Sequence, residues 1–132
     1  RLETPALGRG ETILVIEDEE ILRMLMREML TRSGYKVLEA KDGEEGVTLF
    51  RAEHQSIDVV ISDMGLPVLS GEQVFHELRA ADRNVRLIFS TGYIRDEKRQ
   101  ELLDAGAKRF IHKPYRVDEM LAALREVLDA PH

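Results

Sequence analysis

Residues Asp58 to Pro67, with the sequence DVVISDMGLP, decide the fold of this chain. A short apolar run, Val59-Val60-Ile61, stops at Ser62-Asp63 and passes into a loop that contains glycine and proline. A run of this length and β-branched character is typical of a central strand in a parallel sheet covered on both faces. Ligands of open α/β sheets bind beyond the carboxyl ends of the strands, so Asp63 would stand where chemistry occurs. Taken alone, the same aspartate could simply solvate a turn.

The composition describes one acidic domain. The chain has 132 residues, 43% of them hydrophobic, which is enough for a single core. With 33% charged residues and a net charge of -6, it offers no basic face for DNA, so direct nucleic-acid binding is not expected. The absence of cysteine excludes disulfides, thiol nucleophiles and Cys-ligated zinc, and agrees with a cytoplasmic location. Because it lacks a run of about 18 apolar residues, we expect no membrane contact by this domain.

The first eleven residues are predicted to be a linker, and residues 12–130 the domain. Pro5, Gly8 and Gly10 occur in this segment without hydrophobic periodicity. The chain starts at Arg1 instead of Met, which suggests a piece of a longer polypeptide or a processed or tagged chain.

Strand-like and helix-like patterns alternate along the domain. Besides the run before Asp63, strands are predicted at Thr12 to Ile16, Lys36 to Ala40, Arg86 to Ser90 and Arg109 to His112. Helices are predicted at Ile21 to Leu30, about 44–52, after the capping box Ser70-Gly71-Glu72-Gln73, at about 95–105 and at about 117–128. Five such units with short connections predict an α/β fold with right-handed crossovers. The periodicity does not give the order of the strands.

Two of the predicted helices differ in how many apolar residues they carry. The first has a stripe of six apolar residues, Ile21, Leu22, Leu25, Met26, Met29 and Leu30. The helix near residues 95–105 has only Leu102 and Leu103 to pack near its end, so its first turns are expected to be weakly anchored.

Polar residues follow four of the predicted strands. Glu17 and Asp18 follow the first, Asp63 ends the third, Thr91 follows the fourth and Lys113 the fifth. Glu19 and Glu20 are interpreted as charges of the first helical turn. Because parallel strands end at one edge of a sheet, we expect the polar residues at the strand ends to share a crevice. These residues are Glu17, Asp18, Asp63, Thr91 and Lys113.

This residue set suits phosphoryl chemistry. Three carboxylates in one crevice repel each other unless a cation compensates, and hard oxygen ligands select Mg²⁺ or Mn²⁺. Lys113 and Thr91 could bind phosphate oxygens, and Asp63 is the predicted nucleophile. Individually, Lys113 could be a surface lysine and Thr91 an ordinary turn residue. His54, His76 and His112 lack a repeated ligand spacing and are interpreted as structural or solvated.

With these motifs assembled, residues 11 to 130 resemble the receiver domain of two-component response regulators. The resemblance is carried by Ile13 to Glu19, by Asp63 with Pro67 and Gly71, by Ser90 to Tyr93, and by Phe110 to Pro114. It implies a flavodoxin-like (βα)5 three-layer sandwich with a parallel sheet of order 2-1-3-4-5. It also implies that Asp63 accepts a phosphoryl group from a phosphohistidine, with self-phosphorylation and autodephosphorylation but no turnover of a substrate.

The resemblance also implies roles for single residues. Asp18, Asp63 and the backbone carbonyl of Gly65 would bind Mg²⁺, and Glu17 would act on the metal through water. Lys113, preceding a cis Pro114, would contact the phosphoryl group. In the switch, Thr91 would move toward the phosphate while the aromatic residue Phe110 turns inward.

The partners implied are a sensor histidine kinase or phosphotransfer protein as donor. A downstream protein or neighbouring domain would meet the face of the fourth helix, fifth strand and fifth helix. The composition before Thr12 is also similar to what precedes the carboxyl-terminal receiver of hybrid histidine kinases.

Three positions depart from the family pattern. Glu17 replaces the more usual Asp and Phe110 replaces Tyr, and neither change removes a needed function. Gly65 has no side chain to shield a phosphoryl group from water, which leaves the lifetime of the acyl phosphate open, and Tyr93 is an alternative shield.

Other functions remain to be weighed. A receiver-like interaction module that never carries phosphate would be expected to lack Asp63 or Lys113. An aspartyl-phosphate hydrolase of the better-known kind has D-x-D where this chain has Glu17-Asp18-Glu19. A flavodoxin-like cofactor carrier would need a phosphate-binding loop where these acids stand.

Overall fold

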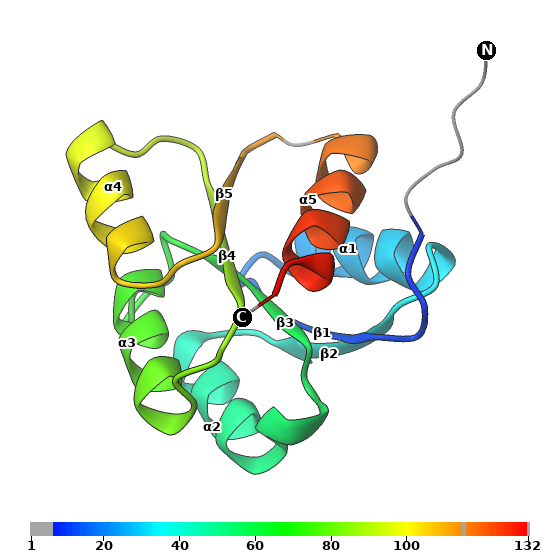
Figure 1. The fold of residues 1–132 in the computed structure, drawn as a ribbon, viewed down its shortest axis with the longest axis horizontal. Helices are drawn as coiled ribbons and strands as arrows, with labels where there is room; N and C mark the ends of the chain where they lie inside the picture. Colours follow the sequence, from blue (N-terminus) through cyan, green and yellow to red (C-terminus); the bar gives the residue numbers. More distant parts are fainter. Residues whose placement is uncertain (1–6, 115, 132) are drawn as a thin grey trace.

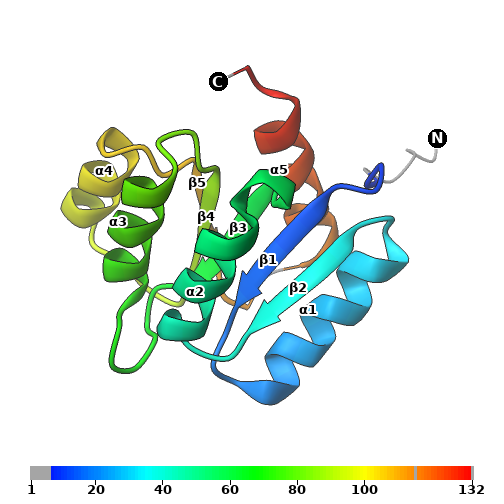
Figure 2. The same ribbon diagram turned by 90° about the horizontal axis from the view of Figure 1, so that it is seen from below.

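The computed structural model describes residues 7–114 and 116–131 and shows a five-stranded sheet between two layers of helices (Figures 1 and 2). The strands are β1 Thr12–Ile16, β2 Lys36–Ala40, β3 Val59–Asp63, β4 Leu87–Thr91 and β5 Arg109–His112. The helices are α1 Glu20–Arg32, α2 Gly43–Glu53, α3 Gly71–Ala81, α4 Asp96–Asp104 and α5 Val117–Asp129, with a short 3₁₀ turn, η1, at His54–Ser56.

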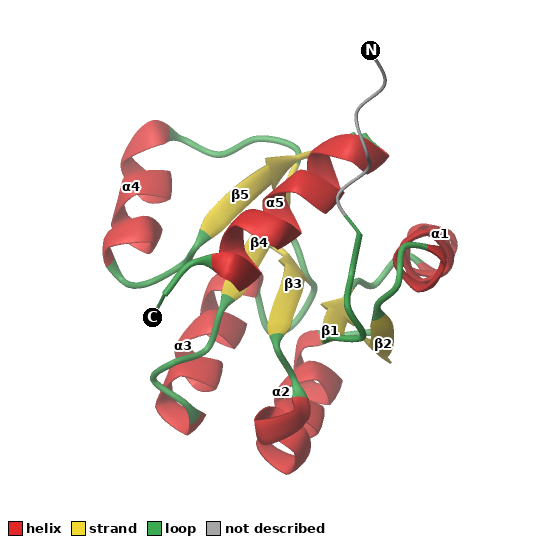
Figure 3. Ribbon diagram, turned by 45° about the vertical axis from the view of Figure 1, so that its right-hand side comes forward, coloured by secondary structure: helices red, strands yellow, loops and turns green. Residues whose placement is uncertain are grey.

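All neighbouring strands are parallel, and their order is β2-β1-β3-β4-β5 (Figure 3). This confirms the predicted flavodoxin-like fold. The register sets Asp63 beside Ser90, and Thr91 beside His112. The carboxyl ends of β3, β4 and β5 therefore reach the same edge of the sheet.

The sheet separates two hydrophobic cores, because successive side chains of a strand point to opposite faces. Val60 and Phe89 face the core beneath α2, α3 and α4, whereas Val59, Ile61 and Ile88 face the core beneath α1 and α5. Burial on both faces explains why the central strands read as continuous apolar runs instead of alternating ones.

Local capping fixes where two helices begin. At α3, the Ser70 hydroxyl accepts a hydrogen bond from the Gln73 amide, and the Gln73 side chain accepts one from the Ser70 amide. This is the predicted capping box. At α2, the Asp42 carboxylate accepts from the Glu45 amide, so this helix begins at Gly43.

The burial of α1 differs from its apolar pattern, whereas the burial of α4 follows it. In α1, Met26 and Leu30 are buried, but Ile21 and Leu25 are exposed, so only part of the predicted stripe packs on the sheet. The face of α1 that meets the sheet is narrower than the stripe. In α4 only Leu102 is buried, which agrees with the weak anchoring expected from its sequence.

Within the described part of the chain, no helix is long and apolar enough to cross a membrane. Residues 1–6 of the predicted linker lie outside the described residues, and the boundary at residue 12 stays a prediction. Residues 8, 10 and 11 make backbone hydrogen bonds to residues 33–36.

Candidate functional site

The crevice at the carboxyl edge of the sheet brings together four of the predicted residues. Glu17 and Asp18 directly follow β1, Asp63 is the last residue of β3, and Lys113 directly follows β5. The Lys113 Nζ atom lies 3.2 Å from Glu17 Oε1 and 3.3 Å from Asp63 Oδ2. The ammonium group therefore bridges two carboxylates that come from different strands.

The three acids converge closely enough to share a cation. One carboxylate oxygen from each of Glu17, Asp18 and Asp63 lies within 4.8 Å of the other two. Glu17 is buried, Asp63 is partly exposed and Asp18 is open to solvent. A set of carboxylate oxygens with access to solvent fits a hard divalent cation such as Mg²⁺ or Mn²⁺, which keeps water ligands.

Glu17 is held in place through both carboxylate oxygens. Its Oε2 atom accepts a hydrogen bond of 3.1 Å from the Glu19 amide, while Oε1 faces Lys113. Its backbone carbonyl accepts from the Arg23 guanidinium at 2.7 Å. Burial raises the pKa of Glu17, and the nearby negative charge of Asp63 adds to this effect, whereas the Glu19 amide and Lys113 oppose it.

Lys113 is oriented by its backbone. Its amide donates to the Thr91 carbonyl at 2.7 Å, which continues the pairing of β5 with β4 beyond the strand end. The peptide bond to Pro114 is cis, as predicted. Burial disfavours the charge of Lys113, but Asp63 and Glu17 outweigh it and raise the pKa, so the side chain remains a cation at neutral pH.

The Asp63 carboxylate is positioned from two sides. Its Oδ1 atom accepts a hydrogen bond of 3.1 Å from the Gly65 amide, and Oδ2 faces Lys113. At the start of α3, a Cβ atom on Gly71 would overlap the Asp63 carbonyl oxygen. Glycine at position 71 therefore lets α3 begin directly beside the backbone of Asp63.

Space is open above the same carboxylate. A Cβ atom built on Gly65 would have one neighbour within 4 Å in the described part of the chain besides residues 64 and 66, the Asp63 Oδ1 atom at 3.9 Å. Tyr93, the alternative shield, has an exposed side chain. The predicted role of the Gly65 carbonyl as a metal ligand stays a prediction.

Thr91 is buried at the edge of the crevice, but its hydroxyl is bonded within its own loop. The Oγ1 atom donates to the Tyr93 carbonyl at 2.9 Å. Phe110 stacks on Phe89 with ring centroids 5.3 Å apart, and the Arg99 guanidinium lies 5.9 Å from the Phe110 ring centroid. A hollow of about 280 Å³ between α4 and β5 is lined by Thr91, Ile94, Asp96, Arg99, Phe110 and His112.

Two residues near the site were given no role by the sequence. Arg23 holds the Glu17 carbonyl from α1, but nothing in the helical pattern distinguishes it from other surface arginines. Ser90, beside Asp63 in the register, has a buried hydroxyl with no hydrogen-bond partner among residues 7–114 and 116–131. In the sequence, the one sign of this buried hydroxyl was a serine between the apolar run Leu87 to Phe89 and Thr91.

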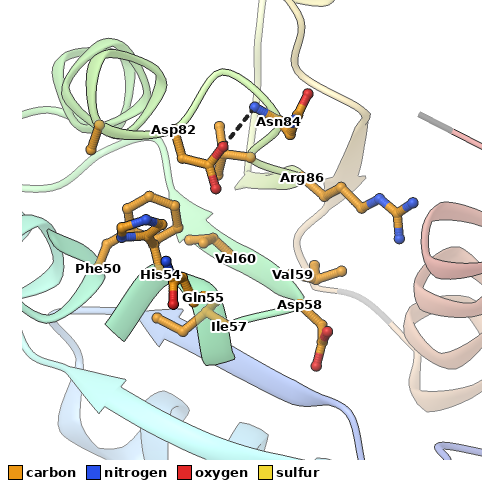
Figure 4. A pocket seen from close by; sticks show the side chains of 12 residues that line it. Phe50, His54, Gln55, Ile57, Asp58, Val59, Val60, Asp82, Asn84 and Arg86 are labelled. Carbon is orange, nitrogen blue, oxygen red and sulfur yellow. Dashed lines mark hydrogen bonds between the residues drawn. The ribbon is translucent and has the colours of Figure 1, made fainter. Parts of the chain in front are cut away.

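A second hollow lies at the opposite end of the strands (Figure 4). It has a volume of about 430 Å³ and is lined by residues that include His54, Asp58, Asp82 and Arg86. Asp82 already accepts a hydrogen bond from the Asn84 amide, and Asp58 accepts one from the Thr12 amide. None of Glu17, Asp18, Asp63, Thr91 and Lys113 lines this hollow, so it is separate from the acidic crevice.

Comparison with known proteins gives consistent matches. Residues 13–125 match the family described as response regulator receiver domain. Sporulation initiation phosphotransferase F of Bacillus subtilis is 29% identical over 119 residues, which cover 90% of this chain and 94% of that protein. A probable transcriptional regulator, ycf27, of Porphyridium aerugineum is 37% identical over 89% of this chain, which spans only 48% of that relative.

A solved structure agrees in fold and describes a bound metal. It is the receiver domain of the sensor histidine kinase PA1611 of Pseudomonas aeruginosa PAO1, with a magnesium ion coordinated in the active site cleft. It is 31% identical to this chain with a TM-score of 0.80, and the match covers 92% of this chain and 99% of that one.

Proposed function

Because the chain belongs to the family of response regulator receiver domains, which are phosphoacceptors in two-component systems, we propose that Asp63 is the residue that carries the phosphoryl group. One observation supports this choice above the others. Asp63 ends β3, the central strand of the sheet, and combines access to solvent with a Lys113 Nζ atom 3.3 Å from its Oδ2 atom, whereas Glu17 also contacts Lys113 but is buried. An ammonium group at this distance can neutralise an oxygen of a phosphoryl group attached to the carboxylate.

The metal ligands in this proposal are Asp18, Asp63 and the backbone carbonyl of Gly65, with Glu17 acting through water. The chemistry supplied by bound Mg²⁺, or by Mn²⁺, is neutralisation of charge on the phosphoryl oxygens. The oxygen-only cluster of Glu17, Asp18 and Asp63 supports this assignment, as does the related receiver with magnesium in its cleft. Glu17 keeps Lys113 and the Glu19 amide in position while Asp18 stays accessible.

In the reaction, an Asp63 carboxylate oxygen attacks the phosphorus atom of a phosphohistidine. A new P–O bond forms as the P–N bond breaks, and the histidine nitrogen leaves with the electron pair. Lys113 stabilises charge on the transferred group. Hydrolysis of the acyl phosphate by water later restores the Asp63 carboxylate.

The switch in this proposal starts from the hydrogen bond of Thr91. The hydroxyl exchanges the Tyr93 carbonyl for a phosphoryl oxygen, and Phe110 moves into the space that this change opens beside α4. Phosphorylation shifts a pre-existing equilibrium through these differential contacts. The surface formed by α4, β5 and α5 then presents the signal to a downstream protein or neighbouring domain.

The phosphodonor in this proposal is a sensor histidine kinase or a phosphotransfer protein in the cytoplasm. A hybrid histidine kinase is one parent chain that fits, because a receiver of a sensor histidine kinase is among the similar structures. This chain also spans only 48% of the ycf27 relative, which supports a receiver that is joined to another domain in a longer chain.

Incubation with acetyl phosphate and Mg²⁺, followed by intact-mass measurement, tests the proposal. We expect the mass to rise by one phosphoryl group. Asp63→Asn should abolish this gain, and a chelator should prevent it in the unchanged protein. Asp58→Asn is the matched control, because Asp58 precedes the same strand at its opposite end and should leave labelling intact.

Absence of labelling with several small donors and with either Mg²⁺ or Mn²⁺ would contradict the proposal. Equal labelling of Asp63→Asn would contradict the choice of residue.

A further inference from the structure

Residues Leu7 to Glu11, here called the strap, lie against the turn between α1 and β2. The Gly8 amide donates to the Ser33 carbonyl at 2.7 Å, and the Gly10 amide donates to the Gly34 carbonyl at 2.9 Å. The Glu11 carbonyl accepts from the Lys36 amide at 2.9 Å. The strap, which the sequence suggested to be a linker, is therefore held by three backbone hydrogen bonds although it forms no strand. Figure 3 shows this segment passing between α5 and α1 toward β1.

Arg125 of α5 joins the strap to the carboxyl-terminal helix. Its guanidinium lies 2.8 Å from Glu11 Oε2 and 2.7 Å from Asp129 Oδ1. It also donates to the Leu7 carbonyl at 3.4 Å and to the Tyr35 hydroxyl at 3.5 Å. Only 13% of the Arg125 side chain and 20% of the Glu11 side chain are exposed, so this ion pair is shielded more than an ordinary surface pair, whereas the Asp129 side chain is 52% exposed.

The close approach of the Gly8 backbone to Tyr35 and Gly34 is a second, independent sign that the strap packs on the domain. A Cβ atom at this position would lie 2.7 Å from the Tyr35 ring and 2.8 Å from the Gly34 carbonyl oxygen. Tyr35 itself is buried and packs with the core beneath α1 and α5. Any larger residue at position 8 would have to lift the strap from Tyr35.

We propose that the strap is part of the folded unit and that Arg125 couples it to α5, so that the strap and the second half of α5 loosen together. The helix begins shortly after Lys113 in the sequence, and Arg125 and Asp129 near its end face Glu11 and Arg9 of the strap. A partner that binds either the strap or α5 would therefore change the stability of the other. This coupling does not depend on the chemistry of Asp63.

Hydrogen exchange measured by mass spectrometry tests the coupling in Arg125→Gln. The Gly8 and Gly10 amides should exchange about 10-fold faster or more, and amides in the second half of α5 should also exchange faster. The core strands β1 and β3 should keep their protection. Arg86 donates separately to the Leu128 and Ala130 carbonyls, so α5 should remain helical.

Arg9→Gln is the matched control. The Arg9 side chain is 77% exposed and reaches Asp129 only at 3.9 Å, so this variant should exchange like the unchanged protein. Gly8→Val should also loosen the strap, because the larger side chain displaces it from Tyr35 while Arg125 is kept. This variant tests the coupling if Arg125→Gln does not fold.

Three results would overturn the proposal. The Gly8 and Gly10 amides could exchange at unprotected rates in the unchanged protein, which would mean that the strap is not folded. If strap amides exchanged faster in both variants while α5 amides exchanged at the unchanged rate, the strap and α5 would not be coupled. An effect of Arg9→Gln equal to that of Arg125→Gln would show that the particular contacts of Arg125 are not responsible.

Discussion

Gly65 places no side chain beside the carboxylate of Asp63, whose Oδ1 atom accepts a hydrogen bond from the Gly65 amide. Among residues 7–114 and 116–131, and apart from the two chain neighbours, Asp63 Oδ1 is the one atom within 4 Å of a Cβ atom built at this position, so a side chain has room beside the carboxylate. The side chain at position 65 would therefore set the lifetime of the acyl phosphate, while the backbone of the same residue keeps its hydrogen bond to Asp63 and its proposed metal contact.

We expect Gly65→Met to slow autodephosphorylation by about 3- to 10-fold, a barrier increase of about 1 kcal/mol, because an apolar side chain excludes water from the phosphoryl group. The measurement is the decay of the phosphorylated mass after the donor is removed, with Mg²⁺ present. Val68→Met, in the same loop but with its side chain in solvent, should decay at the unchanged rate. An identical rate in Gly65→Met would contradict this role of position 65.

Val68 is held in a backbone conformation that valine disfavours. It has a φ of 64°, and its side chain is 97% exposed, so no packing compensates for the cost. Asparagine tolerates this left-handed region much better than a β-branched residue.

Val68→Asn should therefore stabilise the protein by about 1 kcal/mol, measured as the free energy of unfolding in urea. Val68→Ala lacks the short polar side chain with which asparagine can hydrogen-bond locally in this conformation, so it should give a clearly smaller gain. A stability of Val68→Asn equal to or below that of the unchanged protein would argue against strain at this residue.

Single residues differ in how far their positions follow from the sequence. Glu17, Asp18, Asp63 and Lys113 could be assigned to one crevice because parallel strands end at a common edge. The bond from the Thr91 hydroxyl to the Tyr93 carbonyl could not be predicted, since it depends on the path of one loop. The Arg125 contacts join residues 11 and 125, and no local pattern signals such a distant pair.

At the level of elements, α4 is the helix with the least apolar attachment. Leu102 is its single buried residue, and Lys98 connects the helix to α3 by an ion pair of 3.3 Å with Glu72. Both side chains of this pair are partly exposed, and such pairs contribute little to stability. Weak anchoring of this kind supports the proposed part of α4 in the switching surface.

Leu102→Ala should lower the free energy of unfolding by about 2–5 kcal/mol, because it removes buried methyl groups and leaves a cavity. The hydrogen-exchange rates of backbone amides should rise most in α4. Leu103→Ala, one residue further along the helix and only partly buried, should cost less than about 1 kcal/mol. Equal effects of the two substitutions would show that α4 is not anchored through Leu102.

The contrast between α1 and its apolar pattern marks a limit of periodicity. The pattern correctly predicts a helix, but Ile21 and Leu25 are exposed while Met26 and Leu30 are buried. Periodicity gives the direction of an apolar face. It does not give the width of the surface that covers this face, which depends on the neighbouring strands and helices.

For the whole molecule, the alternation of strands and helices was enough to predict an α/β fold with the site at one edge. The strand order β2-β1-β3-β4-β5 was not contained in that alternation and followed only from the resemblance to receiver domains. Two cores on opposite faces of the sheet then fix every strand end relative to the others. The positions of the acids and the lysine are therefore a property of the entire fold.

The central claim is that this fold makes Asp63 the phosphorylated residue. After incubation with acetyl phosphate and Mg²⁺, reduction with borohydride converts an aspartyl phosphate to homoserine, which tandem mass spectrometry can assign to one position. We predict homoserine at position 63, absent when a chelator is added. Homoserine at position 18, with Asp63 unchanged, would contradict the account.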